Sequence, residues 1–346
     1  MAKSDTNYLV TIGIPMYQVE NYIRRTLESV LSQTYPNIEF LIIDDCSTDS
    51  SLEIVKSFQT NHSRGGDIRI IAHNENLGVS ETRNHIIDEA KGDYLYFVDS
   101  DDIISQDAIS LLVQQIELHN ADAAFGSYEK VDISGERSFF SYPMSVFDED
   151  NTFANFVFKK YAGFQASACN YLMNIDLLRR YNLRFFKADF WEDMVFTLCF
   201  ASYVQRVVLL PNITYTYQCR EKSLSKKWGE EDIPKKCIMQ YFNAIECLKD
   251  EAVKQKTKPY FPQMCYFAII SDIYIICNIL KKWNSIRPPF SKHELDVFLC
   301  HPSSFAVIMS FNQMRIANMV LFLFSKFPIS WRLFFIHLFA KYKRLL

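Results

Sequence analysis

Four short apolar segments in the first hundred residues constrain the fold of this chain most strongly. They cover residues 9–15, 39–43, 68–71 and 94–98, and apolar runs of this length are typical of buried strands. Between the first two runs, apolar side chains recur at helical spacing at Ile23, Leu27, Val30 and Leu31. Alternating strands and helices predict an α/β fold with a mostly parallel sheet, helices on both faces and right-handed crossovers.

Carboxylates gather where two of these predicted strands end. Asp44 and Asp45 follow the second strand, and Asp99, Asp101 and Asp102 follow the fourth. Ligands of open α/β sheets bind at this edge, beyond the carboxyl ends of the strands. Clustered carboxylates repel one another and are costly to bury unpaired, and a divalent cation relieves both penalties. The pattern indicates a metal–diphosphate site for Mg²⁺ or Mn²⁺, with a solvated acidic loop as the alternative.

Composition excludes several classes of protein. The 346 residues are 49% hydrophobic, which supplies a sizeable core and suggests about two structural units. The net charge of −3 argues against nucleic acid as a primary partner. Nine cysteines without a CxxC pair, and a first segment without an apolar signal pattern, favour a cytoplasmic protein with reduced thiols.

Taken together, these motifs resemble those of inverting glycosyltransferases of family 2, of the bacterial cell-surface polysaccharide type. The resemblance covers residues 8–225 and rests on pieces in the family's order: Ile14-Pro15-Met16-Tyr17, Ile43-Asp44-Asp45-Cys46-Ser47, Asn76-Leu77-Gly78 with Arg83-Asn84, Val98-Asp99-Ser100-Asp101-Asp102, Trp191-Glu192-Asp193, and Tyr215-Thr216-Tyr217 with Arg220 and Ser223. Two departures, Thr82 for the family's Ala and His85-Ile86 where Gly is common, lie on a predicted helix. These departures bear on which substrate is used more than on which reaction is catalysed.

The resemblance implies the GT-A fold and an inverting transfer of a sugar from a nucleotide-diphosphate donor to a saccharide or lipid-linked hydroxyl. In the family, the Asp of a Glu-Asp pair is the base, which here is Asp193. Asp101, with Asp99, would hold Mn²⁺ or Mg²⁺. Donor contacts would come from Pro15, Tyr17, Asp45, Arg83, Asp99, Ser100 and Arg220. Tyr17 can stack on a uracil ring and Asp45 can accept its imide N–H, so these two residues favour a UDP-sugar as the donor. Asp44 is instead expected to bind the backbone N–H groups of its loop.

A nucleotidyltransferase and a non-catalytic nucleotide-sugar-binding protein are the alternatives. The first typically needs an early Gly-rich loop with Arg and Lys, and no such loop follows the first predicted strand. A dehydrogenase would need G-x-G-x-x-G there, which is also absent. Intact Asp99, Asp101 and Asp193 favour an enzyme over a binding protein. The transferred sugar stays open among Gal, GlcNAc, GalNAc and Glc.

The family signal fades near residue 228, so we expect a catalytic domain over residues 1–228 and an α-helical region over 229–346. Helices are predicted over residues 235–256, 260–283, 291–299 and 303–324. Residues 316–346 combine Trp331 and several Phe with a basic end, which suits a peripheral helix in a membrane interface. A packed helix with a solvated end is the alternative. No uninterrupted apolar run reaches the roughly 18 residues of a spanning helix.

Overall fold

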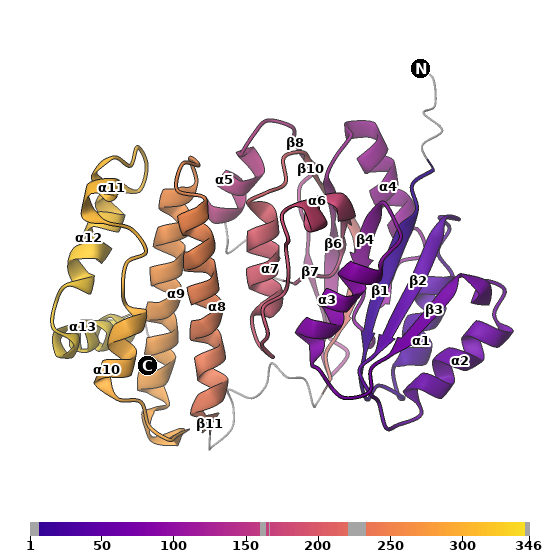
Figure 1. Ribbon diagram of the computed structural model, residues 1–346, viewed down its shortest axis with the longest axis horizontal. Coiled ribbons are helices and arrows are strands. Elements are labelled where there is room, and N and C mark those ends of the chain that lie inside the picture. The colour runs from indigo at the N-terminus through magenta and orange to yellow at the C-terminus, as the bar shows by residue number, and fades with distance from the viewer. Residues whose placement is uncertain (1–6, 160–163, 166, 221–232, 343–346) are drawn as a thin grey trace. The chain divides into compact units, whose positions relative to one another are not determined.

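The computed structural model describes residues 7–159, 164–165, 167–220 and 233–342 (Figure 1). The chain divides into two units. Unit 1 holds residues 1–153, 166–189 and 203–223, and unit 2 holds residues 154–165, 190–202 and 224–346. Two internal segments from the predicted catalytic domain therefore pack with the C-terminal helices. The predicted boundary at residue 228 lies outside the described residues.

A mixed sheet forms the centre of unit 1. Its strand order is β3–β2–β1–β4–β9–β6–β10–β5, with β7 beside β6 and β8 beside β10. The strands are β1 (Val10–Met16), β2 (Ile38–Asp44), β3 (Ile68–Ala72), β4 (Tyr94–Phe97), β5 (Ile103–Ile104), β6 (Ala123–Val131), β7 (Arg137–Phe140), β8 (Ser145–Phe147), β9 (Tyr171–Asn174) and β10 (Val207–Gln218). Strands β1 to β4 are parallel neighbours, as predicted. β9 runs antiparallel to both β4 and β6, which makes the sheet mixed.

The helices of unit 1 connect these strands. They are α1 (Ile23–Leu31), α2 (Ser51–Asn61), α3 (Val79–Glu89), α4 (Ala108–His119) and α6 (Ile175–Arg180), whereas α5 (Thr152–Lys159) crosses from unit 1 into unit 2. α1 buries the predicted apolar stripe of Ile23, Leu27, Val30 and Leu31. The crossovers α1, α2 and α3 bring the next strand back in parallel, so the carboxyl ends of β1, β2 and β4 meet at one edge.

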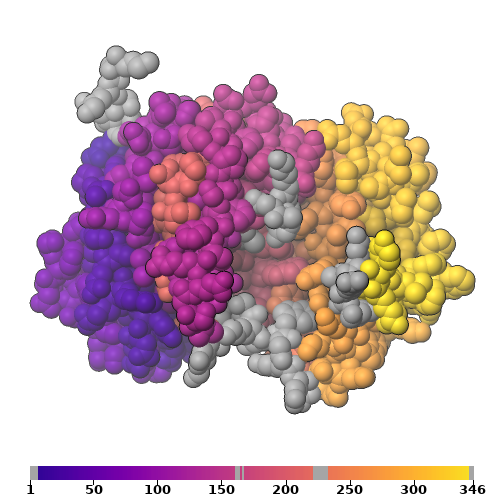
Figure 2. All heavy atoms as spheres, turned by 180° about the vertical axis from the view of Figure 1, so that it is seen from behind, coloured from indigo at the N-terminus to yellow at the C-terminus, as the bar shows by residue number. Residues whose placement is uncertain are grey.

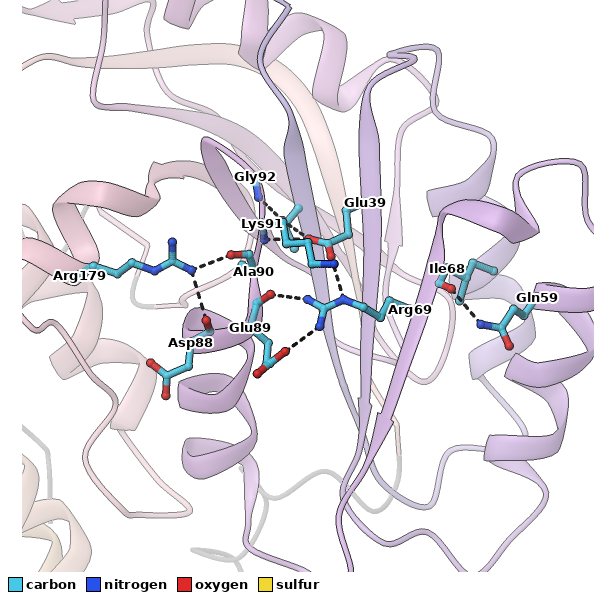
Figure 3. Close-up of polar contacts among 11 residues, drawn as sticks. Glu39, Gln59, Ile68, Arg69, Asp88, Glu89, Ala90, Lys91, Gly92 and Arg179 are labelled. Atoms are coloured by element: carbon cyan, nitrogen blue, oxygen red, sulfur yellow. Dashed lines mark hydrogen bonds and ion pairs between the residues drawn. The ribbon is translucent and has the colours of Figure 1, made fainter.

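The opposite edge of the sheet is fixed by Arg69 at the start of β3. Its guanidinium donates to Glu39 of β2 at 2.9 Å and to Glu89 at the end of α3 at 2.7 Å (Figure 3). Glu39 also accepts the backbone N–H of Lys91 at 3.0 Å, just before β4. This network links β2, β3, the segment before β4 and α3 at the end of the sheet away from the acidic residues, so it is structural.

Unit 2 is helical. Its helices include α7 (Glu192–Ala201), α8 (Lys235–Lys254), α9 (Phe261–Lys281), α10 (Lys292–Phe298), α11 (Phe305–Met309), α12 (Arg315–Ser325) and α13 (Ile329–Tyr342). The single helix predicted over residues 303–324 was wrong: it is α11 and α12, separated where Met314 takes a left-handed conformation with φ of 54°.

Among the described residues, α9 is the one helix that is long and apolar enough to cross a membrane by composition. Core helices of soluble proteins pass the same test, and 56% of its apolar window is buried within the protein. Asp272, near its middle, is fully buried and pairs with Lys249 of α8 at 2.7 Å. We therefore interpret α9 as the central helix of unit 2.

Candidate active site

The acidic loop, residues 99–102, follows β4 and the buried Val98 at the carboxyl edge of the sheet. In β1, Met16 is paired with Asp44 at the end of β2, while Gly13 is paired with Phe97 at the end of β4. The strand ends that carry Asp44–Asp45 and the acidic loop therefore flank β1 at the same edge. The sequence predicted this shared edge correctly.

Asp102 ties the acidic loop to the end of β10. It is 1% exposed, and its carboxyl accepts the Tyr215 hydroxyl at 2.7 Å and the Gln218 N–H at 2.8 Å. The Tyr215 hydroxyl also accepts the backbone N–H of Asp99 at 3.2 Å. Burial, then the neighbours Asp99 and Asp101, raise the pKa of Asp102 well above its ordinary value. Asp102 is thus a buried residue that connects the acidic loop to β10, and it is not solvated.

Asp99 and Asp101 each face an arginine. Arg83 of α3 donates to Asp99 at 2.8 Å, and Arg220 lies with its Nε 2.5 Å from the Asp101 carboxylate. The guanidinium of Arg220 also lies over the Tyr22 ring, 5.3 Å from its centroid. Burial raises the pKa of Asp101 to about 6; repulsion by Asp99 adds to the rise and the charge of Arg220 opposes it. The site therefore joins two carboxylates and two guanidinium groups from separate parts of unit 1.

The acidic loop has the donor chemistry for a hard divalent cation. Among the described residues, no three His, Cys, Asp or Glu side chains converge on one point as a complete metal cage. Mg²⁺-type ions commonly take one or two carboxylates and complete their shell with water and substrate phosphates. Asp99 and Asp101 supply such oxygens, and a cation would offset both causes that raise the pKa of Asp101, which are burial and then repulsion by Asp99. These two residues fit the predicted metal.

Asp45 lies in a network at the end of β2. It is 3% exposed, and its carboxylate accepts the Leu77 N–H at 2.9 Å and the Gly78 N–H at 2.8 Å. His73 lies with Nδ1 2.7 Å from the same carboxylate, and its Nε2 lies 2.9 Å from Nδ1 of His85. A carboxylate has about four acceptor sites, so Asp45 retains capacity for one more donor. The two histidines were not among the predicted site residues.

The remaining donor-site predictions lie beside β1. Pro15 is buried within the strand, and Tyr17 follows it with 47% of its surface exposed. The side chain of Asp44 accepts the Ser47 N–H at 3.2 Å, which is the loop-amide role expected for it. Ser100 uses its backbone carbonyl to accept the Thr26 hydroxyl of α1 at 3.0 Å. Tyr17 therefore presents a ring to solvent at the same edge as the acidic loop.

Asp193 occupies the first turn of α7, in unit 2. The helix begins at Glu192, which is 7% exposed, after Trp191 in a left-handed conformation with φ of 62°. Asp193 is half-buried and accepts its neighbour's Met194 N–H at 2.7 Å. The Glu192-Asp193 pair therefore opens a helix. Ser223, expected beside Arg220, lies outside the described residues.

Comparison with known proteins identifies the family. The model of glycosyl transferase family 2 matches residues 11–190, more than half of the chain. The chain therefore belongs to glycosyl transferase family 2, and the predicted family is confirmed. The matched region holds β1 to β4 and the acidic loop, and it ends just before Glu192 and Asp193.

Several curated relatives are glycosyltransferases of bacteria. The chain is 35% identical over 232 residues to glycosyltransferase GlyA of Streptococcus pneumoniae serotype 4, a match of 64% of this chain and 32% of GlyA. It is 31% identical over 224 residues to the uncharacterized glycosyltransferase EpsJ of Bacillus subtilis, covering 63% of each. A cholesterol galactosyltransferase of Borreliella burgdorferi is 26% identical over 291 residues, 80% of this chain and 77% of that protein. The chain spans less than two thirds of the length of the first curated relatives it matches.

The solved structures confirm the fold. S. aureus TarS 1–349, in complex with UDP-GlcNAc, superposes with a TM-score of 0.64 and covers 92% of this chain and 90% of its own, at 18% identity. The same fragment in complex with UDP gives a TM-score of 0.52. The predicted GT-A architecture with C-terminal helices is therefore correct.

Proposed function

We propose that this chain is an inverting glycosyltransferase that transfers a sugar from a UDP-sugar to a hydroxyl of a saccharide or lipid-linked saccharide in surface polysaccharide synthesis. One observation carries the proposal: Asp99 and Asp101 lie in the loop after β4, and each faces an arginine, Arg83 or Arg220. Two carboxylates with two guanidinium groups can hold a metal-bound diphosphate, because the carboxylates bind the metal cation and the guanidinium groups bind the anionic phosphates.

The uridine preference is supported by Asp45 and Tyr17. Asp45 keeps acceptor capacity for the imide N–H of uracil while its loop bonds hold it in place. The exposed ring of Tyr17 offers a stacking surface directly after β1. A solved relative in fold, TarS, has been crystallised with UDP-GlcNAc and with UDP, which agrees with this donor class.

Arg220 has a second role in this proposal. In the structure it neutralises Asp101 and rests on the Tyr22 ring. Its planar fork can donate to two phosphate oxygens of the donor once the acidic loop has another positive partner. Bound Mn²⁺ or Mg²⁺ would neutralise charge on the leaving diphosphate as a Lewis acid. Arg220→Lys keeps the charge but loses the fork, so UDP affinity should fall by about tenfold, and Arg220→Gln should lower it further.

Asp193 is the proposed base. Inversion needs a carboxylate that accepts the acceptor's hydroxyl proton on the face opposite the diphosphate. The first turn of α7 favours an ionised carboxylate because the backbone N–H groups there are positively polarised. Asp193 is half-buried, whereas Glu192 beside it is buried, so Asp193 has the better access to a substrate hydroxyl.

Two substitutions separate the proposed base from the donor site. Asp193→Asn should leave calorimetric UDP–Mn²⁺ affinity almost unchanged and lower single-turnover transfer by roughly 10²–10⁴-fold. Asp101→Asn should weaken metal-dependent UDP binding and transfer together. Asp176→Asn, an exposed carboxylate in the first turn of α6, is the matched control and should change neither.

The outcomes of this comparison are distinct. Normal transfer by Asp193→Asn would place the base elsewhere, and Glu192 would be tested next. Loss of UDP binding in Asp193→Asn would move Asp193 into the donor site and refute the mechanism. Full activity in excess EDTA would refute the proposed metal dependence. A screen of UDP- and GDP-sugars by thermal shift supplies the donor, because a ligand that binds the native state raises its melting temperature.

The setting proposed for this reaction is the cytoplasm. The nine cysteines are free thiols, and burial raises the pKa of three of them, Cys169, Cys199 and Cys265, well above the ordinary value. Reduced buried thiols of this kind suit a reducing compartment. Relatives in teichuronic acid and chondroitin synthesis support an acceptor of the cell-surface polysaccharide class.

A further inference from the structure

The outer helices of unit 2 expose a continuous series of large apolar side chains. On α12 they recur every three or four residues, and on α13 they do so over the whole helix, with Phe327 between the two. We call this surface the α12–α13 face; its members are Ile316, Val320, Leu323, Phe327, Trp331, Phe334, Phe335, Leu338, Phe339 and Tyr342, each between 43% and 82% exposed. Both helices are drawn in yellow in Figure 2. Helical spacing places each set on one side of its helix.

Each of the same two helices also buries a polar side chain, and α13 buries Ile336 and Ala340 beside it. Asn318 is the buried residue of α12, and its side chain donates to the Pro262 carbonyl at the start of α9 at 3.0 Å. On α13, Arg332 is 4% exposed and forms an ion pair with Asp296 of α10. These helices therefore bury few side chains, two of them polar, and expose most of their large aromatic residues, which departs from the usual amphipathic arrangement.

Charge is distributed just as unevenly. Residues 297–346 contain six Lys and Arg and no Asp or Glu, whereas residues 1–296 contain 31 Lys and Arg and 40 Asp and Glu. Lys326, at the end of α12, and Lys341, in the last turn of α13, are exposed beside the apolar series. A positive surface with exposed Trp and Phe matches the chemistry of an interface between anionic headgroups and acyl chains.

We propose that the α12–α13 face docks on an anionic lipid bilayer, with both helices lying in the plane of its surface. A second copy of this chain fits the face less well, because two faces that are both basic and free of carboxylates would repel each other on contact. The bilayer supplies the negative charge that the face lacks and an apolar layer for its aromatic side chains. This goes beyond the proposed sugar transfer and does not depend on it.

Vesicle flotation of the full chain tests the proposal. Wild-type protein should float with phosphatidylglycerol-containing vesicles, and less with neutral phosphatidylcholine vesicles or at high salt. Trp331→Ser/Phe334→Ser/Leu338→Ser should lower partitioning by about tenfold or more, because three large apolar groups no longer enter the bilayer. The matched control is Leu118→Ser/Phe139→Ser, two residues of similar exposure in unit 1, and it should float like the wild type.

Charge variants supply an independent measurement. Lys326→Glu/Lys341→Glu should lose the preference for anionic vesicles, and Lys326→Arg/Lys341→Arg should keep it. Trp331 emission, taken as the difference between wild type and Trp331→Phe, should shift to shorter wavelength with anionic vesicles. UDP affinity measured on every variant keeps the result separate from the donor site.

Three results would overturn the proposal: wild-type protein that stays unbound, serine variants that float equally well, or an unshifted Trp331. A wild-type dimer that the serine variant converts to monomer, without vesicle binding, would assign the face to a second copy.

Discussion

Tyr215→Phe removes one oxygen atom and should loosen the acidic loop. The hydroxyl of Tyr215 donates to the Asp102 carboxyl at 2.7 Å and accepts the Asp99 N–H at 3.2 Å. It is therefore the bridge between β10 and two residues of the loop that follows β4. The phenyl ring that remains fills the same space, so the loss is confined to polar contacts.

The magnitude follows from those two bonds. A hydrogen bond to a buried carboxyl contributes about 1.5–3 kcal/mol, and one from a backbone amide contributes about 1 kcal/mol, so the free energy of unfolding should fall by about 2.5–4 kcal/mol. Tyr94→Phe is the matched control. Tyr94 is a buried tyrosine of β4 whose hydroxyl donates to the neutral Ala121 carbonyl at 2.9 Å, and loss of this bond should cost about 1 kcal/mol.

Urea unfolding of the wild type and both variants measures this difference. UDP–Mn²⁺ affinity of the same samples reports whether the loop has moved, because Asp99 and Asp101 are the proposed ligands. Tyr215→Phe should lose affinity by about tenfold or more and Tyr94→Phe should keep it. Equal stability of the two variants, together with unchanged affinity in Tyr215→Phe, would show that the bridge does not hold the loop.

Two further predictions concern other buried groups. His73→Ala should weaken UDP binding a few-fold by releasing one side of Asp45, and His73→Asn, which restores a donor near the Nδ1 position, should recover it in calorimetry. Burial raises the pKa of Asp272 to about 7, and Lys249 only partly opposes this. A folded-state pKa above the unfolded one gives stability that is complete below about pH 4 and is lost as the pH rises towards 7. Unfolding free energies measured across that window should fall with pH in the wild type and less in Asp272→Asn.

The first half of the sheet could be predicted because its signals are local. Each of β1 to β4 is a short apolar run, and each acidic pair stands directly after its strand. Parallel pairing then follows from the helices between them, so the shared edge of Asp45 and Asp99 needed no long-range information. The same reasoning located α8, α9 and α10 within a few residues.

Other features depend on contacts that sequence spacing does not reveal. His73 follows β3 and His85 belongs to α3, and their 2.9 Å contact arises only when both elements pack beside β2. The break between α11 and α12 coincides with a polar stretch at Asn312 and Gln313, a signal that was available but weaker than the apolar pattern around it. The packing of residues 154–165 and 190–202 with the C-terminal helices is likewise a property of the folded chain.

The residues that the family model matches do not include all the contacts of the acidic loop. This limits how short a fragment with an intact donor site can be. The match ends at residue 190, whereas Tyr215 and Arg220, the partners of Asp102 and Asp101, lie beyond it. Without β10 and Arg220, Asp102 would lose its hydroxyl partner and Asp101 its cation, and among the three neighbouring carboxylates Asp99 alone would keep its arginine, Arg83. A fragment limited to the matched residues should therefore fail to bind UDP, although it contains every carboxylate of the loop. The acidic motif can be recognised from sequence alone, but the charge balance that makes it a site depends on residues more than a hundred positions later.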